Sequence, residues 1–166
     1  MGTQGVGINK AWALGIVDVG PIVLSHCENP AKAEAIEFIT KVLTGEVNAV
    51  IPLTTFIGAY HIMTRHLRIK RKDVAEELLK TLQLRSPTFI GDISIDSCIS
   101  AIRHASEFNI ASWDGYIITL AENMGASIIY TIDQKLAKVK HINIVIPISR
   151  DTLIAYHEWV KTHLKT

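Results

Sequence analysis

The sequence ASWDGYIITLAENMGASIIYTID, residues 111–133, combines a helical segment, a glycine stop and a short apolar strand. Ser112 is a suitable N-cap, Asp114 falls in the first helical turn, and Gly125 marks the end of the helix. The run SIIYTI has the composition of a buried strand, and Asp133 follows it. In an open parallel sheet, the strand ends and the starts of the following helices meet at one crevice. We therefore expect Asp114 and Asp133 to lie at the same rim.

The rest of the chain alternates apolar strand-like runs with amphipathic helices. The run over 13–17 is continuously apolar and ends on Asp18, as expected for a strand covered on both faces. Further strands are expected at 48–51, 88–90 and 142–146. Strands that alternate with helices in this way predict an α/β protein with a mostly parallel sheet.

Two of the intervening helices have predicted starts and faces that bear on the site. Pro52 ends the second strand, and Thr54 or Thr55 can cap the next helix. Ser94 is expected to start a later helix. The spacing of its apolar side chains predicts a buried face made of Ile95, Cys98, Ile99, Ile102 and Ala105.

The composition is that of one globular domain. The 166 residues are 48% hydrophobic and 20% charged, and the net charge of +1 neither favours nor excludes a nucleic-acid partner. The two cysteines lack zinc-site spacing. No run approaches the roughly 20 apolar residues of a membrane span, and no signal pattern precedes the first strand, so we expect a cytoplasmic location. Residues 1–11 are predicted to form a flexible leader, and 12–166 a single domain.

Asp18, Asp114 and Asp133 are all expected at the carboxyl ends of the strands. Each alone could be a helix cap or a partner of a helix dipole. Three carboxylates close together repel one another unless a cation neutralises them. Carboxylate oxygens favour Mg²⁺ or Mn²⁺, and such an ion can activate a water and hold a phosphodiester for in-line attack. The three aspartates therefore predict metal-assisted phosphodiester hydrolysis.

Three segments, in this order, resemble a PIN domain, particularly the small archaeal and bacterial VapC-like toxins. They are IVD at 16–18, WDGYIITLAENMGA at 113–126 and YTID at 130–133. The resemblance extends from Leu14 to Ile148. It implies a three-layer α/β/α sandwich with central strand order 3-2-1-4-5.

The same resemblance implies a function. It is that of an Mg²⁺- or Mn²⁺-dependent endoribonuclease, the toxin of a toxin–antitoxin pair, with Asp18, Asp114 and Asp133 as catalytic metal ligands. The hydroxyl that often precedes the last acid by two residues maps onto Thr131. The implied partners are RNA, a second copy of the chain and an antitoxin protein that blocks the site.

The sequence departs from the PIN pattern in the helix after the second strand. The family usually has a glutamate there, and its place is taken by Gly58. Between Glu46 and Asp73 there is no other acid, and Glu122 lies about 80° around the helix from Asp114. The acidic cluster is therefore one residue short. This departure motivates an alternative function, a catalytically weak or inactive PIN-fold module for RNA binding or assembly.

Other features have both structural and functional interpretations. The basic run with Arg65, Arg68, Lys70 and Arg71 could bind RNA phosphates, or could be a solvated connection between helices. His61 is expected near the site, one turn after Gly58. Trp113 could stack on a base or serve as a packing anchor.

A different α/β phosphohydrolase is a weaker possibility. A haloacid-dehalogenase-like site would need a second aspartate two residues after Asp18, where Gly20 stands. The chain also lacks the GxxxxGK[ST] motif of a P-loop.

Overall fold

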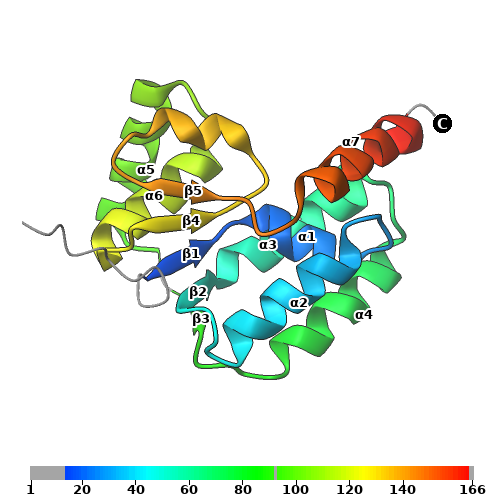
Figure 1. Cartoon of the computed structure of the whole chain (residues 1–166). Coiled ribbons are helices and arrows are strands. Elements are labelled where there is room, and N and C mark those ends of the chain that lie inside the picture. Colours follow the sequence, from blue (N-terminus) through cyan, green and yellow to red (C-terminus); the bar gives the residue numbers. More distant parts are fainter. Residues whose placement is uncertain (1–13, 92, 165–166) are drawn as a thin grey trace, which may run out of the picture.

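The computed structural model describes residues 14–91 and 93–164, so the predicted leader lies outside the described residues (Figure 1). The strands are β1 (Gly15–Val17), β2 (Ala49–Pro52), β3 (Phe89–Ile90), β4 (Ile128–Tyr130) and β5 (Asn143–Val145). The helices are α1 (Val19–His26), α2 (Lys32–Leu43), α3 (Leu53–His61), α4 (Arg71–Leu82), α5 (Ile95–Phe108), α6 (Ser112–Met124) and α7 (Arg150–Leu164). Two short turns complete the order, the π-helical η2 (Ile62–His66) and the 3₁₀-helical η3 (Gln134–Lys138).

The described strands form a five-stranded parallel sheet in the order β3-β2-β1-β4-β5. This order confirms the predicted fold class. The central strand is β1, in which Gly15 is paired with Ala49 of β2 and Ile128 of β4. β1, which ends just before Asp18, and β4, which ends shortly before Asp133, are therefore direct neighbours.

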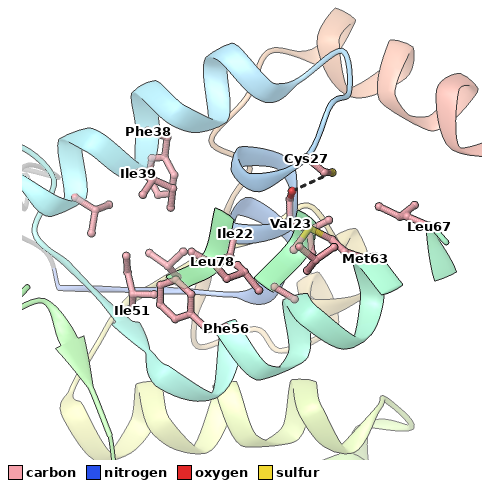
Figure 2. Packing of buried hydrophobic residues seen from close by; sticks show 14 of the residues in the cluster. Ile22, Val23, Cys27, Phe38, Ile39, Ile51, Phe56, Met63, Leu67 and Leu78 are labelled. Carbon is pink, nitrogen blue, oxygen red and sulfur yellow. Dashed lines mark hydrogen bonds between the residues drawn. The ribbon is translucent and has the colours of Figure 1, made fainter. Parts of the chain in front are cut away.

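Helices cover both faces of the sheet. Successive residues of a strand point to opposite faces, so each strand contributes side chains to the core on either side. Val17 belongs to the core shared with α1–α4, whereas Ile16 belongs to the core shared with α5 and α6 (Figure 1). Figure 2 shows part of the first of these cores, in which Phe38 and Ile39 of α2 belong to the same cluster as Ile51 and Phe56. Helix α7 packs beside α1 and α2 through a third cluster that includes Tyr156.

The predicted buried face of α5 is wrong. Its isoleucines are exposed, Ile95 by 81% and Ile102 by 66%, and the helix instead buries Ala101 against α6. The reason is the very close approach of the two helices: a Cβ on Gly115 would lie 2.2 Å from the Ala101 carbonyl oxygen. Small residues permit this contact and large isoleucines do not.

Helix starts agree with the sequence only in part. Ser94 caps α5, and its hydroxyl accepts a hydrogen bond from the Ser97 N–H at 3.0 Å. Thr54 and Thr55 do not cap α3, which begins directly after Pro52. Ser112 is the first residue of α6 rather than its N-cap, a position that Ala111 holds without a side-chain hydrogen bond.

No helix among the described residues is both long and apolar enough to cross a bilayer.

The contact of Gly115 with α5 gives a direct test of the fold next to Asp114. We expect Gly115→Ala to lower the free energy of unfolding by about 2–3 kcal/mol, because the new methyl group meets backbone rather than a flexible side chain. Guanidinium denaturation measures the change. Gly91→Ala is the matched control, since its Cβ would meet only the tip of Leu53, at 3.3 Å. Equal stability of the two variants would contradict the close helix contact.

Candidate functional site

Asp18 stands at the end of β1 and is the N-cap of α1. Its side chain is only 3% exposed, yet both oxygens have partners. Oδ1 accepts a hydrogen bond from the Val19 N–H at 2.7 Å, and Oδ2 accepts one from the Thr131 hydroxyl at 2.7 Å. Burial raises the pKa of Asp18 above its ordinary value, although these two hydrogen bonds act in the opposite direction.

The Thr131 hydroxyl connects two of the predicted acids. It donates to Asp18 and accepts a hydrogen bond from the backbone N–H of Asp133 at 3.0 Å. The Asp133 carboxylate in turn caps η3, with Oδ1 accepting from the Lys135 N–H at 2.9 Å. Thr131 is fully buried, so this bridge fixes the end of β1 relative to the segment that follows β4.

Asp114 lies in the first turn of α6 and faces the other two acids. Burial raises its pKa to about 6, with further contributions from the charges of Asp18 and Asp133. The positive charge of Lys135 opposes the shift more weakly. The three carboxyl groups thus interact electrostatically across the rim.

All three carboxylates line one cavity of about 170 Å³, which we call the acid cavity. No lysine, arginine or histidine is among the described residues that line it. The structure therefore brings together Asp18, Asp114 and Asp133, as the parallel topology predicted, and leaves their charges without a cationic side chain in the cavity. Its polar and aromatic lining residues are Asp18, Asp114, Thr131, Asp133 and Tyr156. Tyr156 comes from α7, and no sequence pattern predicted it at the site.

The donor set of the acid cavity suits a hard divalent cation, because its charged groups are carboxylates and its hydroxyl is an oxygen donor. However, no group of three or more histidine, cysteine, aspartate or glutamate side chains within 14–91 and 93–164 is arranged so that it could hold a metal ion. Mg²⁺ typically takes one or two protein carboxylates and keeps several waters. The cavity fits that mode by charge and donor type, rather than as a closed protein cage.

An aromatic ring lies against position 58, where the PIN pattern would have a glutamate. A Cβ on Gly58 would lie 3.0 Å from Cζ2 of Trp113 and 3.3 Å from Cγ2 of Val19. The indole of Trp113 therefore lies directly against the backbone of α3. Its Nε1 is buried and has no hydrogen-bond partner among the described residues, an arrangement that costs about 1–3 kcal/mol.

A second cavity, of about 650 Å³, adjoins the acid cavity and shares Asp114 and Asp133 with it. We call it the indole cavity. The part of its lining that distinguishes it from the acid cavity comes from α3, η2 and the start of α6, namely Ile57, Gly58, His61, His66, Ala111 and Trp113. The sequence placed His61 near the site, but nothing in it indicated His66.

The π-helical turn η2 explains why both histidines reach this cavity. Positions five residues apart in an α-helix differ by about 140° around the axis. In a π-helical turn the bonding is from i to i+5, and here the Leu67 N–H donates to the Ile62 carbonyl at 3.0 Å. The rings of His61 and His66 are consequently neighbours, with centroids 5.7 Å apart and nearly perpendicular planes.

Other predicted contacts lie elsewhere. The side chains of Arg65 in η2, of Arg68 and Lys70 in the connection that follows and of Arg71 at the start of α4 are exposed, and they line neither cavity. Glu122 is not a substitute acid. Its carboxylate lies 3.2 Å from His104 and 2.8 Å from His141, and it lines neither cavity.

No protein-family model and no curated protein matches the chain. Among solved structures, the fold is similar to the crystal structure of PAE2754 from Pyrobaculum aerophilum, with a TM-score of 0.54 and 16% sequence identity over 100% of both chains. At this identity the similarity concerns the fold alone. It agrees with the α/β architecture described above.

The Thr131 bridge predicts a specific loss of stability. We expect Thr131→Val to lower the free energy of unfolding by about 1–3 kcal/mol, because a buried carboxylate oxygen and the Asp133 N–H both lose a partner. Urea denaturation at neutral pH measures this. Thr131→Ser keeps the hydroxyl and should retain most of the stability. If valine and serine behaved alike, the hydroxyl bridge would have no energetic role.

The raised pKa of Asp114 predicts a pH-dependent stability difference. With a folded pKa of about 6 against the ordinary pKa of 3.8, the folded state binds more protons between these values. Ionisation of Asp114 therefore destabilises the fold as the pH rises through this window. We expect Asp114→Asn to gain about 1–2 kcal/mol relative to wild type between pH 4 and pH 7, after allowance for solvent screening.

Thermal or urea denaturation in EDTA across this range measures the gain. Asp96→Asn is the matched control, since Asp96 is an exposed acid in the first turn of α5. If Asp114→Asn did not raise the free energy of unfolding, or raised it less as the pH increased, the claim that ionised Asp114 destabilises the fold would be contradicted.

Proposed function

We propose that this chain is a PIN-type ribonuclease that depends on Mg²⁺ or Mn²⁺ and hydrolyses RNA phosphodiester bonds. The observation that carries the proposal is the meeting of Asp18, Asp114 and Asp133 in one cavity whose described lining contains no cationic side chain. Strand order 3-2-1-4-5 supports it, because this is the order that the PIN resemblance implies.

The roles of the residues follow from their surroundings. One or two of the Asp18, Asp114 and Asp133 carboxylates would bind the cation directly and the others through its waters. When bound, the ion would neutralise the carboxylates and activate water for attack on a phosphodiester. Thr131 is a positioning residue, since its hydroxyl fixes the orientation of the Asp18 carboxylate. Val19 contributes the backbone N–H that holds the other oxygen of Asp18.

The basic connection after η2 supports an RNA substrate. Arg65, Arg68, Lys70 and Arg71 are exposed, and none forms an ion pair with another described residue. Such cations can bind phosphates of a strand that extends beyond the cavity, and their contribution falls as the salt concentration rises.

The homodimer and the antitoxin that the resemblance implies stay predictions. The isoleucines of α5 offer a second copy an apolar face, with Ile95, Ile99 and Ile102 all exposed.

A second candidate function is a PIN-fold module that binds RNA without cutting it. The contact between Gly58 and Trp113 favours this candidate, because the ring occupies the space in which a fourth acid would stand. The two functions share the fold and the basic connection. They differ in whether the acid cavity binds a cation and cleaves.

Isothermal titration with Mn²⁺ and incubation with labelled RNA test the proposal together. We expect wild type to bind Mn²⁺ and to cleave single-stranded RNA only when Mn²⁺ is present, because the carboxylates need a neutralising ion. Asp114→Asn should weaken Mn²⁺ binding at least tenfold, and Asp18→Ala should abolish cleavage. Asp96→Asn, outside both cavities, should behave as wild type.

Indistinguishable Mn²⁺ binding by wild type and Asp114→Asn would refute the metal assignment. RNA that is bound but stays intact, with binding lost in the Arg68→Gln/Arg71→Gln double variant, would favour the binding module.

A further inference from the structure

The indole cavity has the dimensions and lining of a ligand site rather than a packing defect. Its volume of about 650 Å³ lies within the roughly 300–1,000 Å³ usual for small-molecule sites, whereas the acid cavity is well below that range. Its walls combine aliphatic side chains with one indole and two imidazoles. A small number of polar groups on a largely apolar wall is the usual composition of a site for a flat, partly polar molecule.

The aromatic lining is held in place by the backbone. Trp113 rests against α3 because Gly58 has no side chain, and it remains there although its Nε1 is buried without a described partner. His61 and His66 converge because η2 is a π-helical turn, a feature common at functional sites. Three ring systems from two segments of the chain thus line one cavity.

The indole cavity is also contiguous with the acid cavity. Both are lined by Asp114 and Asp133, so a ligand that occupies one lies beside the other. A nucleotide combines the two chemistries that these cavities offer, with a flat base for the aromatic wall and a phosphate for a cation held by the carboxylates.

We propose that the indole cavity binds one unpaired nucleobase of the RNA strand, next to the phosphate at the acid cavity. This inference rests on the proposed function for the position of the phosphate. Bases within a duplex are stacked on one another and cannot enter a cavity. The chain therefore acts on single-stranded RNA or on a flipped-out nucleotide, and the imidazole nitrogens of His61 and His66 are available to hydrogen-bond the base edge.

Nucleosides test the base site without involving metal or phosphate. In EDTA, adenosine, guanosine, cytidine and uridine are titrated while NMR follows the indole N–H signal of Trp113 and the ring protons of His61 and His66. We expect saturable shifts at these rings with at least one nucleoside and none with ribose. Trp159, which stacks between Tyr156 and His163 on α7, is the internal control and should not shift.

Substitution of exposed residues then tests the base site without removing side chains from the buried core. His61→Ala and His66→Ala remove side chains that are exposed at the rim, and we expect each to weaken binding of the best nucleoside about fivefold to tenfold. His157→Ala, on the exposed side of α7, should leave binding unchanged.

The outcomes distinguish this inference from the proposed function. Saturable nucleoside binding to wild type in EDTA, whether or not Mn²⁺ supports cleavage, upholds the base site. Absence of nucleoside-dependent shifts at Trp113 overturns it, and so do equal shifts with ribose. In metal-free buffer with a six-nucleotide RNA, preference for the duplex form over the single strand would also overturn it.

Discussion

The arrangement of the whole rim depends on the burial of one carboxylate at the end of the central strand. Asp18 is 3% exposed, and a buried carboxylate is stable only where hydrogen-bond donors replace water. One donor is the backbone of α1, and the other is the hydroxyl of Thr131 beyond β4. The hydroxyl also accepts from the Asp133 backbone. Satisfying Asp18 therefore fixes the start of α1 and the exit of β4 relative to β1.

The three aspartates can serve as helix caps or dipole partners and still be available as the proposed metal ligands. Asp18 and Asp133 each cap a helical segment, and Asp114 stands in the first turn of α6, where a negative charge complements the helix dipole. Caps and dipoles place carboxylates at helix starts, and the parallel topology gathers those starts at one edge. Burial raises the pKa of Asp114, and repulsion by the charges of Asp18 and Asp133 raises it further. An arrangement that is locally favourable is therefore unfavourable as a cluster of like charges, a cost that the proposed cation would relieve.

Much of the fold followed from the sequence because it depends on local patterns. Apolar runs that end in Asp18 and shortly before Asp133 defined the strands, and the topology rules for parallel sheets brought the acids together. Contacts between elements were less accessible. The face of α5 was predicted from the spacing of its apolar side chains, whereas Ala101 and Gly115 show that close backbone approach decided it. The η2 turn was also invisible, because one π-helical turn leaves no signal in hydrophobic spacing, and without it His66 could not be placed beside His61.

The packing of Trp113 on Gly58 has a consequence for how such a site could change during evolution or engineering. The indole and an acidic side chain at position 58 compete for one volume, so the two are mutually exclusive alternatives. A glutamate introduced at position 58 alone would have to displace the ring and dismantle the wall of the indole cavity. Gaining a fourth carboxylate would therefore require a compensating smaller residue at 113. Positions 58 and 113 are therefore coupled: together they can provide either an additional anionic ligand or an aromatic surface.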